Sequence, residues 1–259
     1  MERAAKRTEE IAEIEKIEKR IFEIKNNLRE LRYKESKNIE EVLQEDFEEA
    51  HKEFEKLEKN GSFYPLFTKL VNQEDKLIAY LFILSTWNFA GFRYLINKFD
   101  INKFAKTIDD LEPLFNKFEG KKLRTTNFED FEKEINEIYN VLSSQVKSVG
   151  ATKIMHIRKP ELFIMWDRRI REYYGLRDDS AQTYIKFLKQ MQNKFKNIKV
   201  DEEKRTFAKA IDEYNYVKIT KPIMNLEKEL ASLEKLMKKY KNYEKQFRKG
   251  MIEVTFAKF

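Results

Sequence analysis

The apolar positions at both ends of the chain follow the alternating three-four spacing of a coiled-coil seam. The N-terminal stripe resumes as a short second stretch after a polar interval at residues 36–40, and the C-terminal stripe opens near Pro222, which a first helical turn tolerates. The positions are Ile14, Ile17, Ile21, Ile24, Leu28 and Leu31, then Phe47, Ala50, Phe54 and Leu57, and finally Leu226, Leu230, Leu233, Met237, Tyr240 and Phe247. These stripes predict long helices that pair as an antiparallel hairpin within one chain or as a dimer seam.

The middle of the chain has the pattern of many short helices joined by tight turns. Strand-like alternation is scarce, and six glycines and four prolines leave few breaks. We expect helices at about 66–85, 90–99, 101–119, 127–147, 151–158, 167–175, 180–197 and 201–216, with breaks at Asn60-Gly61, Gly120, Gly150, Pro160 and Gly175. The predicted class is all-α, with an N-terminal heptad extension at 1–60, a core at 61–219 and a C-terminal extension at 220–259.

Composition narrows the possible chemistry and partners. A hydrophobic fraction of 41% is ample for a buried core, and a net charge of +7 favours polyanionic partners. Cysteine is absent, which excludes disulfides, thiol nucleophiles and iron–sulfur clusters, and two histidines, His51 and His156, are too few for a histidine-rich metal site. No stretch is apolar enough to span a membrane. We therefore expect a cytoplasmic protein with no metal and no cofactor.

One stretch, from Ser148 to Ile170, combines features that carry chemistry. A turn of small residues is followed by Lys153 on a helix, then by a break at Pro160, a short apolar run, and Asp167 at the start of a basic helix. This order resembles the helix-hairpin-helix DNA glycosylase superfamily, and the short helices of the middle segment fit that resemblance. The resemblance implies a hairpin that grips a DNA phosphate, a lysine that can be a nucleophile and an essential aspartate.

The hairpin is predicted around Gly150 and Ala151, whose small side chains leave the backbone N–H groups of a helix start open to a phosphate. Thr152 adds a hydroxyl group and Lys147 adds a charge. The alternative is that Gly150 only ends one helix before the next begins. A phosphate-binding hairpin therefore remains one of two interpretations.

Lys153 is the candidate nucleophile that the resemblance implies. A lysine attacks the C1′ atom of a sugar only as the neutral amine, so its pKa must be lowered by a dry pocket or by neighbouring cations. Arg158, Lys159 and Arg168 supply positive charge nearby in the sequence. The alternative is a solvated lysine at the start of a helix.

Asp167 is the candidate catalytic carboxylate. It follows an apolar wall that ends in Trp166, and it stands where a helix N-cap is expected, ahead of Arg168. The resemblance implies that this aspartate stabilises the cationic sugar formed as the base leaves, or helps to activate the nucleophile. Helix capping alone is the alternative role.

Further residues are candidates for reading a base or holding the DNA backbone. Trp87 can stack on an extruded base and Asn88 can read its edge, while His156 and Trp166 complete the predicted base pocket. Packing in the core is the alternative for Trp87 and Asn88, and a satisfied, semi-buried position is the alternative for His156. Arg168 and Arg169 alternate with apolar residues as a phosphate-contacting surface does, so we expect them to bind DNA.

The expected function is base-excision repair, by cleavage of the N-glycosidic bond of a damaged or mismatched base in double-stranded DNA. Schiff-base chemistry at Lys153 would add an abasic-site lyase activity, and a DNA partner would place the protein at the nucleoid. One alternative is a noncatalytic DNA-binding or coiled-coil assembly protein that keeps the scaffold. A purely structural helical adaptor is another, and a homodimer through the terminal helices is compatible with each.

Overall fold

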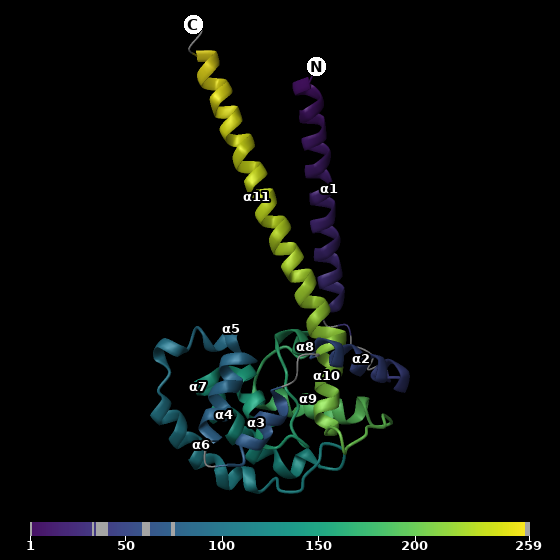
Figure 1. Ribbon diagram of the computed structural model, residues 1–259, viewed down its shortest axis with the longest axis vertical. Coiled ribbons are helices and arrows are strands. Elements are labelled where there is room, and N and C mark those ends of the chain that lie inside the picture. Colours follow the sequence, from purple (N-terminus) through teal and green to yellow (C-terminus); the bar gives the residue numbers. More distant parts are fainter. Residues whose placement is uncertain (1, 33, 35–40, 59–62, 74–75, 257–259) are drawn as a thin grey trace. The chain divides into compact units, whose positions relative to one another are not determined.

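The computed structural model describes residues 2–32, 34, 41–58, 63–73 and 76–256, with side chains from residue 12 to residue 242 within those ranges, Ala90 excepted. In these ranges every regular element is a helix and no strand occurs, which confirms the predicted all-α class (Figure 1). The chain divides into two units. We call Met1–Arg32 with Lys221–Phe259 the helix-pair unit, and Tyr33–Thr220 the core unit.

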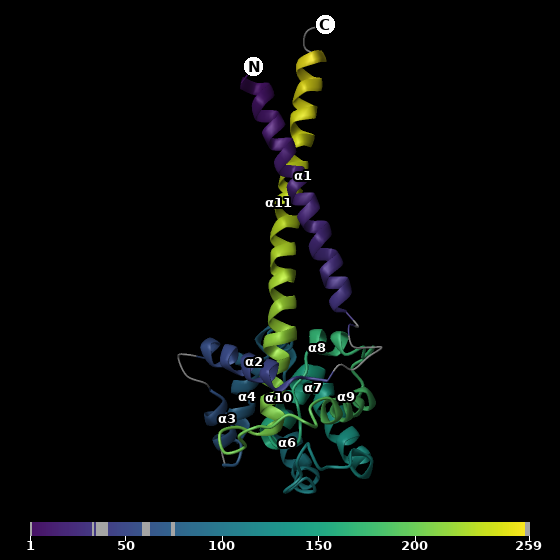
Figure 2. The same cartoon turned by 90° about the vertical axis from the view of Figure 1, so that its right-hand side faces the viewer.

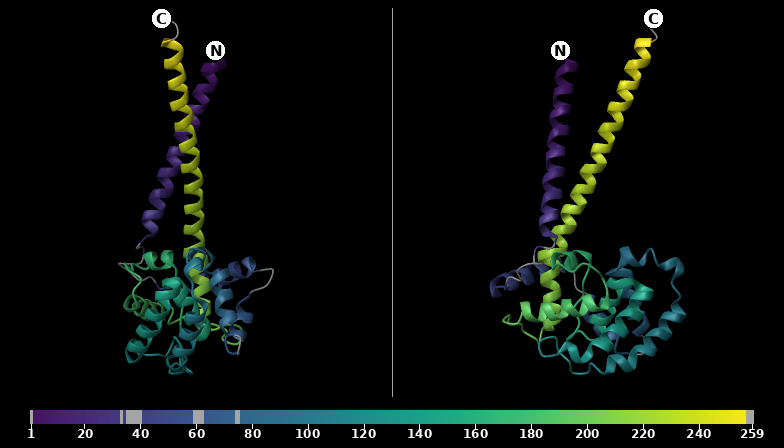
Figure 3. Two further views of the ribbon diagram at one scale, coloured as in Figure 1. Left: turned by 90° about the vertical axis from the view of Figure 1, so that its left-hand side faces the viewer. Right: turned by 180° about the vertical axis from the view of Figure 1, so that it is seen from behind.

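The helix-pair unit consists of α1 (Glu2–Leu31) and α11 (Lys221–Phe256). The two helices lie side by side and run antiparallel, because the N-terminus of α1 and the C-terminus of α11 are at the same end of the pair (Figures 2 and 3). Ile17, Ile24 and Met237 are buried along the seam. Helices α1 and α11 thus pair within one chain, which is one of the two arrangements that their stripes predicted. The side chain of Phe247 lies outside those described. A homodimer stays a prediction.

The core unit contains all the remaining elements. Its helices are α2 (Gln44–Leu57), α3 (Tyr64–Leu70), α4 (Lys76–Thr86), α5 (Phe89–Phe92), α6 (Ile101–Asn116), α7 (Glu132–Arg158), α8 (Arg168–Tyr173), α9 (Ala181–Lys194) and α10 (Phe207–Asn215), with 3-10 turns η1 (Ile96–Lys98) and η2 (Phe128–Phe131) and the π-helical turn η3 (Tyr216–Thr220). Helix α7 contacts α4, α5, α6 and α9, so it is the central element of this unit.

The N-terminal extension does not form one structural element, contrary to the predicted segment 1–60. Helix α2 belongs to the core unit. The reason is its aromatic face: Phe47 stacks on Tyr214, with ring centroids 5.7 Å apart, and meets Phe195 edge-on at 5.8 Å. Because Phe47 is only 2% exposed, its burial fixes α2 in the core unit.

Several predicted helices have different bounds, and those expected at 127–147 and 151–158 are joined in α7. The helix expected at 66–85 is two helices, α3 and α4, and the one expected at 90–99 is reduced to α5 and η1. The helix expected at 201–216 begins only at α10, where the Thr206 hydroxyl accepts a hydrogen bond from the Lys209 N–H as an N-cap. The expected break at Asn60-Gly61 lies outside the described residues.

Candidate functional site

The predicted hairpin is a kink inside α7, and it lies at Lys147 instead of Gly150. Lys147 has φ 63° and ψ 168°, while the residues on either side continue the helix. Gly150 is needed for close packing, because a Cβ atom there would lie 2.9 Å from Val146 Cβ and 3.1 Å from Leu84 Cδ2. The position of the break was therefore predicted wrongly: the small residue serves a tight contact between α7 and α4.

The small residues after the kink are buried, so they present no surface to a phosphate. Ala151 and Thr152 are 0% exposed, and the Thr152 hydroxyl lies 3.4 Å from the Trp166 N–H, from which it accepts a hydrogen bond. Ser148 begins the second helical segment and donates a hydrogen bond to Asp179 Oδ2 at 2.7 Å. The burial of Gly150, Ala151 and Thr152 argues against phosphate binding by these residues.

The cations predicted to contact DNA remain at the surface. Lys147 is exposed at the kink. Arg168 is exposed and forms an ion pair with Glu172 at 3.2 Å, while Arg169 is partly exposed, with Nη1 3.8 Å from Asp167 Oδ2. These three side chains are the predicted phosphate contacts that a DNA backbone can reach.

Lys153 projects from α7 towards the end of α4. Its ammonium group donates a hydrogen bond to the backbone carbonyl of Trp87, which follows the last turn of α4. Burial lowers the pKa of Lys153 to about 8, although the negative charges of Asp167 and Asp212 act in the opposite direction. Lys153 is therefore both a cap on the C-terminus of α4 and an amine that deprotonates close to neutral pH.

Asp167 lies at the start of α8 and caps it, as its sequence position predicted. Its Oδ1 accepts a hydrogen bond from the Ile170 N–H at 2.9 Å, and its Oδ2 accepts one from the Thr220 hydroxyl at 3.1 Å. The side chain is 24% exposed, so solvent reaches the carboxylate. The negative charge of Asp167 raises the pKa of Lys153, although each of the two residues forms its hydrogen bonds with other groups. Lys153 and Asp167 therefore interact electrostatically.

Asp212 is a third member of this site, and the sequence did not single it out. It lies on α10, is 8% exposed and accepts a hydrogen bond from the Met165 N–H, two residues before Asp167. Burial raises the pKa of Asp212 to about 7, and the positive charges of Lys209 and Lys153 limit that rise. Lys153 thus lies in the field of two carboxylates, one capping α8 and one buried on α10.

A sequence signal for Asp212 does exist. The helix around it is apolar at Ala208 and Ile211, and a residue four positions after Ala208 falls on the same buried face. A carboxylate on an apolar face is uncommon unless it is paired. This pattern can identify a buried charge, but it cannot show that Lys153 lies beside it.

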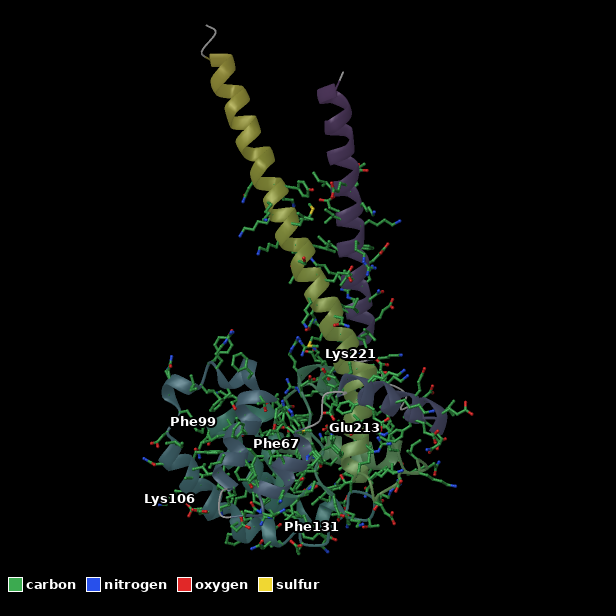
Figure 4. All side chains as sticks on the ribbon, in the orientation of Figure 1. Phe67, Phe99, Lys106, Phe131, Glu213 and Lys221 are labelled. Atoms are coloured by element: carbon green, nitrogen blue, oxygen red, sulfur yellow. The ribbon has the colours of Figure 1, made fainter. Side chains whose placement is uncertain are left out.

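The charges of α10 form a buried cluster around Glu213, which is labelled in Figure 4. Its carboxylate is 2.8 Å from Arg205 Nη1, 2.9 Å from His51 Nδ1 and 3.3 Å from Lys209 Nζ. The Lys209 ammonium also lies 4.9 Å from the centre of the Tyr64 ring, within the range of a cation–π contact. These contacts tie α10 to α2 and α3 through charged groups, in addition to the stacking of Phe47 on Tyr214.

His156 is fully buried and satisfied by two hydrogen bonds. Its Nδ1 donates to the Phe163 carbonyl at 2.7 Å, and its Nε2 accepts from the Tyr64 hydroxyl at 3.1 Å. The Phe163 carbonyl can only accept a hydrogen bond, so Nδ1 carries the hydrogen. Burial lowers the pKa of His156 to about 3, which keeps the ring neutral and leaves Nε2 as the acceptor. The alternative of a satisfied core histidine therefore describes this residue, and its ring has no free edge for a base.

The two tryptophans predicted to line a base pocket occupy different environments. Trp166 is 1% exposed and packs against Tyr184 and Phe187, with ring centroids 5.1 and 5.5 Å apart, so it is a core residue and cannot stack on an extruded base. Trp87 is partly exposed and stacks on Tyr64 at 6.1 Å. Asn88 is 8% exposed. Of the four predicted pocket residues, Trp87 alone keeps an accessible ring.

Two surface pockets lie elsewhere on the core unit. One surface pocket of about 390 Å³ is lined by Arg124, Gln192, Asn193 and Lys196, and a smaller one adjoins it around Arg124 and Glu202. Neither pocket includes Lys153 or Asp167.

Comparison with known proteins gives no relative from which a role can be transferred: no protein-family model, no curated protein and no solved structure matches the chain. Among the described residues, no group of three or more histidine, aspartate and glutamate side chains is placed to hold a metal ion. No helix in that part of the chain has the length and apolarity to cross a membrane. The site must therefore be interpreted from its own geometry.

Proposed function

We propose that the core unit is a DNA base-excision glycosylase with abasic-site lyase activity, in which Lys153 is the nucleophile. The observation that carries the proposal is a largely buried lysine whose pKa is lowered to about 8 beside the carboxylates of Asp167 and Asp212. At pH 7.5 such an amine is neutral in roughly a quarter of the molecules, against about one in a thousand for an ordinary lysine. Buried lysines of this kind are the ones that form Schiff bases.

The proposed reaction assigns a role to each charged group. Lys153 Nζ forms a bond to C1′ as the N-glycosidic bond breaks, and the departing base takes up a proton from solvent. The resulting ammonium releases a proton to Asp212, and Asp212 passes that proton to the ring oxygen of the sugar as the ring opens to a protonated imine. Asp167, which keeps its charge accessible, stabilises the positive charge that develops on the sugar.

A noncatalytic DNA-binding scaffold is the second candidate, and a specific observation favours it. The hydrogen bond from Lys153 to the Trp87 carbonyl and the cap that Asp167 provides for α8 already give both residues a structural role. In that case double-stranded DNA would be held by Lys147, Arg168 and Arg169 without cleavage. Association with the nucleoid would follow from either candidate.

Covalent trapping separates the two candidates. The full chain is incubated with borohydride and a duplex that contains an abasic site, uracil, an oxidised purine or a thymine mismatch, because reduction converts the imine to a stable amine. We expect a covalent complex with the wild type and none with Lys153→Ala. Lys121→Ala, at an exposed lysine of the same unit, is the matched control and should trap as the wild type does.

Asp167→Asn tests the electrostatic role in the same assay. The amide keeps the size of the side chain and can still accept the hydrogen bond from Ile170, but it removes the negative charge. We expect a loss of several kcal/mol in transition-state stabilisation, on the order of a hundredfold in rate, with duplex affinity largely unchanged. If no duplex in the panel gives base release or trapping with the wild type, the noncatalytic scaffold replaces the glycosylase proposal.

A further inference from the structure

A cluster of exposed aromatic rings surrounds Arg93, just after α5. Phe89 is 59% exposed and Tyr94 is 76% exposed. The Arg93 guanidinium carbon lies 5.9 Å from the centre of the Phe89 ring and 5.0 Å from that of Tyr94, and Arg93 Nη2 donates a hydrogen bond to the Tyr94 hydroxyl at 3.0 Å. We call Phe89, Arg93 and Tyr94 the aromatic platform.

The platform is held in place from beneath by buried rings. Phe92 is 6% exposed and packs edge-on against Phe99, with centroids 5.1 Å apart, and Phe99 packs on Phe104 at the same distance. The inward rings are thus anchored while the outward rings stay in solvent. Exposed rings that cluster in this way typically mark an interaction surface.

The charges around the platform favour an anionic partner. Residues 87–106 contain four cations, Arg93, Lys98, Lys103 and Lys106, and a single acid, Asp100. The Asp100 carboxylate is engaged in capping α6, where it accepts a hydrogen bond from the Lys103 N–H at 2.9 Å. Lys106 is exposed and lies with Phe99 at the periphery of the core unit (Figure 4). The segment that carries the exposed rings is therefore net positive, and of the acids that follow it on α6, Asp109 pairs with Lys76 and Glu112 with Arg158.

We propose that the aromatic platform binds the unpaired bases of a single-stranded nucleic acid. Nonspecific single-strand sites combine aromatic rings on which successive bases stack with cations that follow the phosphates. Phe89 and Tyr94 supply the rings, Arg93 supplies a planar cation that can also stack on a base, and the lysines supply the phosphate contacts. Stacking on rings and contacts with phosphates do not distinguish one base from another, so binding is expected to be sequence-tolerant.

The platform adjoins the candidate catalytic site along the chain. Trp87, whose carbonyl accepts the hydrogen bond from Lys153, is two residues before Phe89. The platform therefore begins two residues after the backbone group that Lys153 contacts. The inference does not depend on cleavage, because single-strand binding is measurable on a protein that releases no base.

The experiment is a titration of a fluorescently labelled single strand of twelve thymidines with the full chain, followed by fluorescence anisotropy at low and high salt. We expect saturable binding that weakens as salt rises, and about a tenfold loss of affinity for Phe89→Ala and for Tyr94→Ala. Tyr94→Phe keeps the ring and should bind nearly as the wild type does. Leu43→Ala, at a residue that is 64% exposed ahead of α2, is the matched control and should change nothing.

Two outcomes would overturn the inference. One is binding of the strand that is equal in the wild type and in the Phe89→Ala, Tyr94→Ala double variant. The other is that the wild type does not bind the strand and instead forms a dimer through these rings. Sedimentation would then show a dimer in the wild type that is lost in Phe89→Ala. Because both rings are largely exposed, the variants should fold, and circular dichroism checks this. A protein that binds the strand through the platform but fails the trapping assay supports this inference and rejects the glycosylase proposal.

Discussion

The two units of this protein differ in the burial of their ion pairs, because the core unit combines surface pairs with a buried cluster. In the helix-pair unit, ion pairs lie on the surface: Arg20 and Glu229 meet at 2.7 Å with side chains 43% and 41% exposed. In the core unit, Arg205 and Glu213 meet at 2.8 Å with side chains only 15% and 8% exposed. Exposed pairs contribute little to stability, whereas buried ones must first overcome the cost of removing two charges from water.

The contrast identifies the part of the molecule that departs from a regular apolar core. The helix pair follows a regular repeat, with apolar residues at the seam and charges outside. The core unit buries Asp212, Glu213 and Lys153 and holds Lys147 at a positive φ angle. Departures of this kind tend to gather at functional sites, because an ordinary apolar core has no need of them.

The largest expected effect comes from breaking the buried cluster at its centre. Glu213→Gln keeps the shape of the side chain but removes the charge that faces Arg205 and Lys209. Because the cations remain buried without compensation, we expect the variant to lose about 3–5 kcal/mol of unfolding free energy. Urea denaturation followed by circular dichroism measures this loss.

The matched control is Glu229→Gln in the exposed pair, which should leave the urea midpoint unchanged because solvent replaces the lost contact with Arg20. Equal effects of the two variants would show that burial does not distinguish the two sets of charges. A stabilised Glu213→Gln variant would show that the cluster is a net cost in the folded state.

The second prediction concerns the pH dependence that Asp212 imposes. Its pKa is raised to about 7 in the folded protein, above the ordinary value of an unfolded aspartate, so the folded state binds more protons between these two values. Asp212 therefore lowers stability as the pH rises towards 7. From pH 5 to pH 7, Asp212→Asn should become more stable relative to the wild type by about 1 kcal/mol per pH unit.

Urea midpoints of both proteins at pH 5, 6 and 7 give this difference. His156 and the other titrating groups are present in both proteins and cancel to a first approximation. Asp178→Asn is the control, because serine and threonine hydroxyl groups lower the pKa of Asp178 to about 2, so it stays charged throughout this range. A constant difference between Asp212→Asn and the wild type would mean that Asp212 titrates at its ordinary pH.

The regular parts of the fold could be predicted from the sequence. The seam positions Ile17 and Ile24 are buried as the heptad spacing required, and Asp167 caps α8 as a polar residue ahead of a helix should. Both follow from local rules that apply within one or two helical turns. Helix α2 departed from its predicted extension because Phe47 packs on rings far away in the sequence.

The candidate site was predicted only in part, because its geometry depends on contacts between distant segments. Lys153 and Asp167 were chosen by resemblance, but Asp212 enters the site from a helix about sixty residues after Lys153. Trp166 was placed in a base pocket, whereas its neighbours on α9 bury it. Gly150 suggested a turn, yet a glycine also permits close packing, and a sequence does not distinguish these two uses.

The smallest expected effect tests the kink of α7. Lys147 has a backbone conformation suited to glycine, and such strain typically costs 1–3 kcal/mol. Lys147→Gly relieves the strain but adds entropy to the unfolded chain, so we expect a net gain of about 1 kcal/mol in unfolding free energy. Lys228→Gly makes the same change at an exposed position inside α11 and should instead lose about 1 kcal/mol. The two urea midpoints must therefore move in opposite directions, and a loss at both positions would show that the kink at Lys147 is not strained.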